Sequence, residues 1–169
     1  MRIPTTREDH RVAALAALAI AVHVLESAIP SPLPGVKPGL ANVVTVTALV
    51  LYGWRVALWV GLLRVLAGSL VIGTFLSPTF MLSLAGAVLS LGAMGLGRLA
   101  AGGALSALGY SVLGAMGHML GQVLAAYLLF IPHPALFQLL PVLLSFALLF
   151  GLVSGRIALA LVRRMPADA

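Results

Sequence analysis

The sequence predicts an all-α integral membrane protein, a bundle of six transmembrane helices with both termini on the cytoplasmic side. Hydrophobic residues make up 62% of the 169 residues and charged residues only 8%, against roughly 25% charged residues in soluble domains. The apolar runs are continuous rather than alternating with a period of two, which favours helices over a membrane barrel. Basic residues lie singly at the ends of these runs, as is typical of membrane proteins with positively charged cytoplasmic loops.

The apolar runs are separated by polar, proline-containing or glycine-containing breaks. Residues 1–10 are polar and are expected to form a cytoplasmic segment. Residues 29–38 contain four prolines, which lack a backbone donor and therefore exclude a helix there. We expect one membrane domain, residues 11–164, and a cytoplasmic tail, residues 165–169. The predicted helices within that domain are 11–28, 39–52, 56–72, 80–96, 105–130 and 135–162.

The distribution of basic residues predicts the orientation of this bundle. With six helices, one side of the membrane receives seven arginines: Arg2, Arg7, Arg11, Arg55, Arg98, Arg163 and Arg164. The opposite side receives only Lys37, which lies in the proline-rich segment. Because positive charge is retained on the cytoplasmic side, we expect residues 29–38 to be an external loop. The expected location is the inner cell membrane.

Composition and motifs exclude several classes of function. The formal charge of +6 comes from scattered residues, which does not indicate nucleic-acid binding. Cysteine is absent, which excludes disulfides and thiolate metal sites. The arginines and alanines of the first 25 residues resemble a signal peptide, but no clear cleavage site follows, so an uncleaved first helix is expected. No phosphate-binding P-loop motif occurs. We therefore predict no cofactor, no metal and no catalytic residue.

Glu26 and Arg64 are the ionisable residues of opposite charge that fall at membrane depth. Such residues are costly in hydrocarbon and normally face the bundle interior with a partner. We expect Glu26, Arg64 and Asn42 to line a substrate site in the outer half of the bundle. The alternative is a buried ion pair that fixes the register of the helices.

Two further polar pairs share helix faces. His23 and Glu26 are three residues apart, and His118 and Gln122 are four residues apart. Hydrogen bonding to a ligand or within the bundle is favoured over haem ligation by the two histidines. The glycines of the fifth predicted helix, at positions 114, 117 and 121, are interpreted as a packing face for another helix.

One family carries a similar set of residues. Glu26 and the segments 30–42, 52–55, 63–66 and 83–86 together resemble the Gx transporter family, which is also described as heptaprenyl diphosphate synthase component I. The resemblance covers about residues 25–97, and the remainder matches by hydropathy. Pro38 stands where the family pattern has a leucine.

The family is similar to the S components of energy-coupling factor (ECF) transporters, which are six-helix, substrate-binding membrane proteins. This resemblance implies a pocket lined by Glu26 and Arg64, to which the shared face of His118 and Gln122 adds two further candidate substrate-binding residues. It implies a lid and its root at Pro34, Lys37, Gly39 and Asn42. Its implied partners are membrane lipid, a small-molecule substrate, a transmembrane coupling subunit and separate ATPases. The coupling face would be Ala13, Ala17 and Ala21, although the same spacing also occurs in an ordinary alanine-rich helix.

The resulting prediction is a substrate-binding subunit for uptake of a small organic molecule, anionic or vitamin-like. The alternative is an accessory membrane subunit of isoprenoid diphosphate synthesis or of a flavin- or quinone-linked redox assembly. Prenyl chain elongation by this chain itself is disfavoured, because no aspartate lies between Asp9 and Asp168 to hold magnesium diphosphate.

Overall fold

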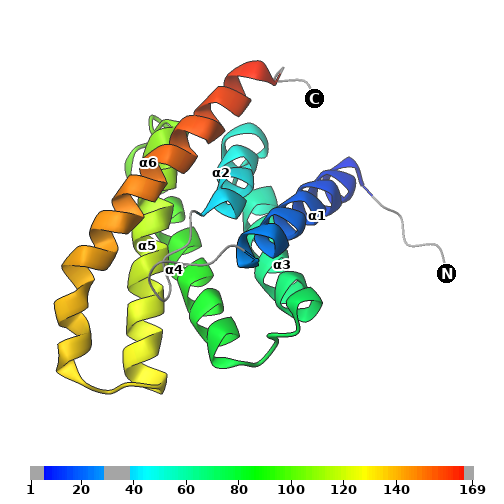
Figure 1. Ribbon diagram of the computed structural model, residues 1–169. Helices are drawn as coiled ribbons and strands as arrows, with labels where there is room; N and C mark the ends of the chain where they lie inside the picture. Colours follow the sequence, from blue (N-terminus) through cyan, green and yellow to red (C-terminus); the bar gives the residue numbers. More distant parts are fainter. Residues whose placement is uncertain (1–5, 29–38, 166–169) are drawn as a thin grey trace.

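The computed structural model describes residues 6–28 and 39–165, and within these ranges the chain is helical with no strands (Figure 1). The prediction of an all-α fold is therefore confirmed. The elements are α1 (Arg7–Ser27), α2 (Leu40–Tyr52), α3 (Trp54–Ile72), α4 (Pro78–Ala100), α5 (Ala107–Leu129), the 3-10 helix η1 (Pro134–Leu139) and α6 (Leu140–Arg164).

Hydroxyl side chains cap the start of three helices. The Thr6 side chain accepts a hydrogen bond from the Asp9 amide, while the Asp9 carboxylate accepts one from the Thr6 amide. Ser77 and Ser106 cap α4 and α5 by accepting hydrogen bonds from the amide three residues later. These caps satisfy backbone donors that have no partner within the helix.

The caps and turns explain where the predicted boundaries were wrong. The first helix begins at Arg7 rather than residue 11, because the Thr6 cap lies before a polar first turn. The predicted turn at residues 97–103 is shorter, since α4 continues to Ala100 and carries Arg98 in its last turn. The last predicted helix is divided into η1 and α6, with Pro141 in the first turn of α6, where a missing amide donor costs little.

Five of the helices are long and apolar enough to cross a membrane, which makes the chain a multi-pass membrane protein. The helix α2 has only 13 residues, fewer than the roughly 20 that a full span requires. Its residues from Val43 to Leu49 are all buried in the bundle. Because α2 is surrounded by other helices, its length need not match the thickness of the lipid.

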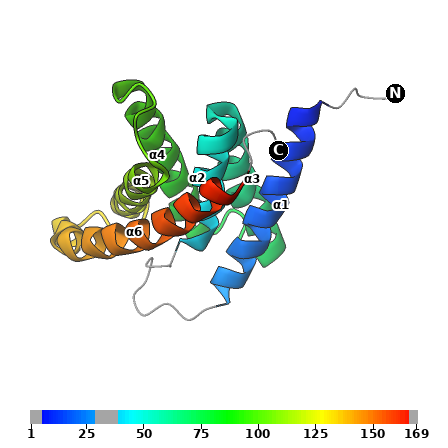
Figure 2. The ribbon, with the colours of Figure 1, turned by 90° about the horizontal axis from the view of Figure 1, so that it is seen from above.

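The helix α2 occupies the centre of the bundle. It packs against α1, α3, α5 and α6, whereas α1 packs only against α2 and α3. Figure 2 shows α2 and α3 between α1 on one side and α4 and α5 on the other. The bundle thus consists of α1–α3 and α4–α6, and these two groups meet through α2 and the α3–α4 contact.

Glycines bring α4 and α5 into close contact. A Cβ atom on Gly117 would lie 2.8 Å from the Leu89 carbonyl oxygen, and one on Gly121 would lie 2.5 Å from the Ala85 carbonyl oxygen. Only glycine permits backbones to approach this closely. The predicted packing face of α5 is therefore confirmed.

The buried core is continuous at one end of the bundle and divided at the other. The main cluster joins α2 and α3 to Tyr110 and Ala158. It lies toward the end where Arg55 Nε approaches Glu8 Oε1 (4.0 Å) and Arg11 lies over the Tyr52 ring. The opposite end has two separate clusters, one between α5 and α6 and one between α3 and α4. A cavity lies between these two clusters.

Candidate functional site

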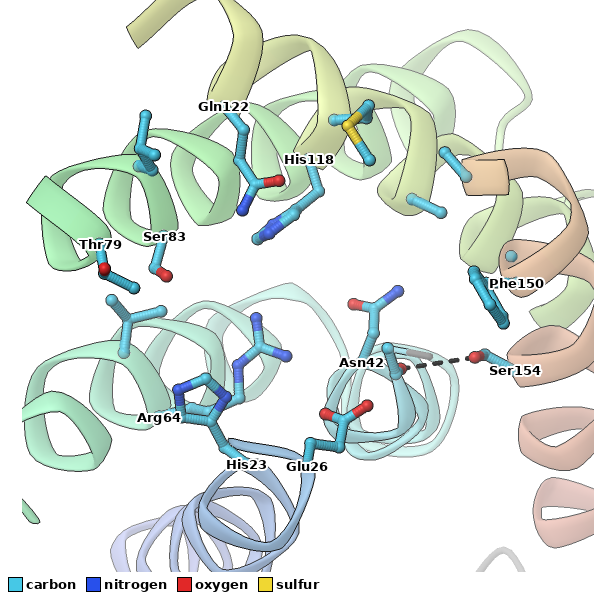
Figure 3. A pocket seen from close by; sticks show the side chains of 17 residues that line it. His23, Glu26, Asn42, Arg64, Thr79, Ser83, His118, Gln122, Phe150 and Ser154 are labelled. Atoms are coloured by element: carbon cyan, nitrogen blue, oxygen red, sulfur yellow. Dashed lines mark hydrogen bonds between the residues drawn. The ribbon is translucent and has the colours of Figure 1, made fainter. Parts of the chain in front are cut away.

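The cavity has a volume of about 330 Å³ and is lined by side chains from all six α-helices (Figure 3). Its apolar lining includes Val65 of the α3–α4 cluster and Met119 and Ala147 of the α5–α6 cluster. Pockets for small organic molecules are commonly about 300–1,000 Å³ and mostly apolar with a few polar groups. The polar lining residues are His23, Glu26, Asn42, Arg64, Thr79, Ser83, His118, Gln122 and Ser154.

Arg64 extends from α3 toward the middle of the cavity (Figure 3). Its side chain is only 8% exposed, and its Nε atom has no hydrogen-bond partner. It forms no salt bridge in the described ranges, although the Glu26 carboxylate lies in the same cavity wall. A buried guanidinium without an anionic partner is costly, and it strongly favours an anion placed beside it.

Glu26, also buried, caps a neighbouring helix. The Leu40 amide donates to Glu26 Oε1 at 2.6 Å, and the Ala41 amide donates to Oε2 at 3.2 Å. The residue at the N-cap position of α2, Gly39, has a left-handed backbone (φ 72°) and no side chain to cap the helix. The carboxylate therefore compensates the free amides and the positive end of the α2 dipole.

This capping role corrects the predicted Glu26–Arg64 ion pair. The two residues line the same cavity, but within the described ranges they form no direct salt bridge. Both carboxylate oxygens of Glu26 are instead bonded to the start of α2. A second contact holds this point, because Ser154 Oγ of α6 donates to the Gly39 carbonyl oxygen at 3.4 Å.

His118 and Gln122 project from α5 into the cavity, opposite Arg64 (Figure 3). The His118 ring fills the space beside Gly86 of α4, where a Cβ atom would lie 2.7 Å from the ring. The ring of His23 from α1 is placed in the same way against Gly68 of α3. Each histidine thus has a glycine facing it on a neighbouring helix, which fixes where the ring can lie.

The cavity brings together most of the residues singled out from the sequence. Glu26, Gly39, Asn42, Arg64, His118 and Gln122 all line it. Pro34 and Lys37 lie outside the described residues. Ala13, Ala17 and Ala21 are exposed on α1 and take no part in the cavity.

Sequence reasoning missed several lining residues. Ser154 and Phe150 lie within a long apolar run, where no charge marks the inward face. Ser83 lies within a segment that carried the family resemblance, so it had a usable signal. His23, which the sequence had singled out on the same helix face as Glu26, lines the cavity as well. Thr79, next to the start of α4, had none.

The donor set suits hydrogen bonding to an organic guest better than metal binding. No group of three potential ligands among His, Asp and Glu comes together in residues 6–28 and 39–165. The two imidazoles, two carboxamides and three hydroxyls of the lining offer both donors and acceptors. Arg64 adds one site for an anion, and the Glu26 carboxylate in the same wall is bonded to the start of α2.

No curated protein and no solved structure matches this chain. The family model described as heptaprenyl diphosphate synthase component I matches residues 15–161, which include every residue that lines the cavity. The chain therefore belongs to the heptaprenyl diphosphate synthase component I family.

Proposed function

We propose that this protein is a membrane-embedded binding subunit that takes up a small organic anion through the cavity between α1–α3 and α4–α6. The observation that carries the proposal is Arg64, a buried cation that faces the cavity, whose Nε atom has no hydrogen-bond partner and which forms no salt bridge within the described residues. An anion bound there offsets the cost of burying the guanidinium and gains charge-assisted hydrogen bonds.

The size and lining of the cavity support an organic guest rather than an inorganic ion. Its volume of about 330 Å³ exceeds what an inorganic anion would fill. Leu82, Met119 and Phe150 provide an apolar wall for the body of the molecule. Burial of that body contributes about 25 cal/mol for each Å² of apolar surface.

Transport through such a subunit requires energy from other chains. Following the resemblance to ECF S components, we propose that Ala13, Ala17 and Ala21 contact a transmembrane coupling subunit that works with cytoplasmic ATPases. All three alanines are exposed on α1, so they are accessible to another helix. The proposed setting is the inner cell membrane, with residues 29–38 external and both termini cytoplasmic.

A second candidate follows from the description of the family, which names a component of a prenyl diphosphate synthase. An accessory subunit that holds a prenyl diphosphate would also use Arg64. Catalysis by this chain itself is disfavoured, because chain elongation needs clustered aspartates to hold Mg²⁺. Glu26, the one acidic residue of the cavity wall, is engaged at the start of α2.

The test is mass spectrometry of the small molecules that co-purify with the protein in mild detergent. The wild type and an Arg156→Gln variant should retain a stoichiometric organic anion, whereas Arg64→Gln should lose it. Arg156 is the matched control, because it is an exposed arginine of α6 that does not line the cavity.

Other results would contradict the proposal in distinct ways. Equal retention by Arg64→Gln would remove the cavity as the binding site. Only lipid in the wild-type extract would argue against a binding subunit. A bound prenyl diphosphate would favour the synthase accessory, and a flavin or haem absorbance band would favour the redox assembly.

A further inference from the structure

Among the described residues of the cavity wall, two buried polar atoms lack a hydrogen-bond partner. They are the Nε atom of Arg64 on α3 and the Oε1 atom of Gln122 on α5. In Figure 3 the two side chains enter the cavity from opposite walls. Their requirements differ, because a guanidinium only donates hydrogen bonds and a carboxamide oxygen only accepts them.

The other buried oxygens without a hydrogen-bond partner do not line the cavity. The hydroxyls of Thr45, Thr47 and Ser111 are also unpartnered, but none of these residues lines the cavity. An unsatisfied buried polar group typically costs about 1–3 kcal/mol, and more when it is charged. Arg64 and Gln122 are thus the unpartnered pair that a single guest in the cavity can satisfy.

The charge near Arg64 further limits the guest. The carboxylate of Glu26 is bonded to the amides of Leu40 and Ala41, so it already compensates the start of α2. Arg64 forms no salt bridge in the described ranges, so its guanidinium is available to one negative charge of a guest. A second negative charge on the guest would be repelled by the Glu26 carboxylate in the same cavity wall, which is strongly unfavourable in an apolar enclosure.

The position of Gln122 is fixed by its neighbours on α5. Gly121 packs directly against the Ala85 carbonyl oxygen, and one turn earlier the His118 ring fills the space at Gly86. The helix cannot withdraw from α4 without losing these contacts, so the backbone of Gln122 stays at the cavity wall. An unpartnered acceptor there discriminates between guests that carry a donor and guests that do not.

We propose that the guest is bifunctional, an organic monoanion that also carries an N–H or O–H donor on the opposite side of an apolar body. Its anionic group pairs with Arg64, and its donor bonds to Gln122 Oε1. This inference rests on the proposed function and names the chemical class of the substrate. It makes Gln122 the residue that determines specificity, while Arg64 provides affinity.

The test uses a panel of matched carboxylates whose members differ in one donor. One such pair is indole-3-acetate and benzothiophene-3-acetate, with 3-methylindole as the analogue that lacks the anion. Binding to purified protein in lipid nanodiscs is measured by isothermal titration calorimetry. The wild type should bind the N–H member of a pair about tenfold more tightly, which corresponds to one net hydrogen bond. The analogue without a carboxylate should bind poorly.

Variants separate the two parts of the inference. In Gln122→Met, a change of similar volume, the preference within each pair should fall to about one while the donor-free member binds as before. Gln138→Met, at an exposed position of η1, should keep the preference. Arg64→Gln should lose both members of each pair. Thermal unfolding of each variant verifies that the bundle remains folded.

The outcomes also distinguish this inference from the function on which it rests. Carboxylates that bind through Arg64 with no preference for a donor in any pair would overturn the bifunctional guest and leave the anion-binding subunit intact. A donor preference that persists in Gln122→Met would likewise overturn it. Carboxylate binding that is absent throughout the panel, or that is indifferent to Arg64→Gln, would overturn the proposed function itself.

Discussion

Glu26 illustrates at the residue scale how a buried acid of the cavity wall can hold a neighbouring helix in place. Its carboxylate accepts from the Leu40 and Ala41 amides, and so it joins the end of α1 to the start of α2. We expect Glu26→Ala to destabilise the protein by about 1–2 kcal/mol, the usual cost of losing a helix cap. Glu26→Gln, which keeps an acceptor oxygen, should lose less. Thermal unfolding in detergent, followed by tryptophan fluorescence, measures both changes.

A different order of stability among the wild type and the two Glu26 variants would indicate another role for Glu26. If both variants unfolded like the wild type but lost the bound anion equally, the carboxylate would act on the guest and not on α2. Glu8→Ala is the control, because Glu8 lies at an exposed position of the same helix and contacts only exposed Arg55. Its removal should have little effect, as is usual for surface ion pairs.

The sequence predicted which charged residues line the cavity, but not which groups they bond. Glu26 and Arg64 could be selected because ionisable groups are rare at membrane depth, and both do line the cavity. They form no direct salt bridge in the described ranges, because the free amides at the start of α2 bind the carboxylate. That competition depends on how residues 39–41 approach α1, which spacing along the chain does not specify. Ser154 and Phe150 were missed for a related reason, since a uniformly apolar helix has no marker of its inward face.

At the scale of elements, the α4–α5 contact holds His118 and Gln122 in place. Gly121 has no room for a side chain, since a Cβ atom would lie 2.5 Å from the Ala85 carbonyl oxygen. Gly121→Ala should therefore separate the two helices and destabilise the protein by about 1–3 kcal/mol, the typical cost of overpacking. It should also weaken anion binding, because Gln122 is the next residue. Thermal unfolding and the co-purification assay give the two readouts.

Gly92 provides a matched control on α4, since nothing lies within 4 Å of the Cβ atom that an alanine would add there. Gly92→Ala should leave stability unchanged or raise it by up to about 1 kcal/mol through better helix propensity. If the two alanine variants behaved alike, close backbone packing would not be what holds α4 and α5 together. The glycine spacing on α5 was sufficient to predict a packing face, although it did not identify α4 as its partner.

The whole molecule combines one continuous core with one divided end. The main cluster lies at the end that carries Glu8, Arg11 and Arg55, and the cavity lies between the two clusters at the other end. The six α-helices of the described ranges could be predicted, because helix formation depends on local composition. The division of the core could not be predicted, because it depends on which helices do not contact each other. The helix α1, for example, makes no contact with α4, α5 or α6.

The orientation of this asymmetric bundle can be tested directly, because the chain has no cysteine of its own. Ala104→Cys places a thiol in the exposed turn between α4 and α5, and Gln138→Cys places one on η1, at the opposite end of α5. If positive charge is retained in the cytoplasm, a membrane-impermeant maleimide should label Gln138→Cys in intact cells and Ala104→Cys only after permeabilisation. The reverse pattern would place the divided end, with its cavity, toward the cytoplasm. The protein would then bind its anion from inside the cell, and uptake would have to give way to export or to an accessory role in synthesis.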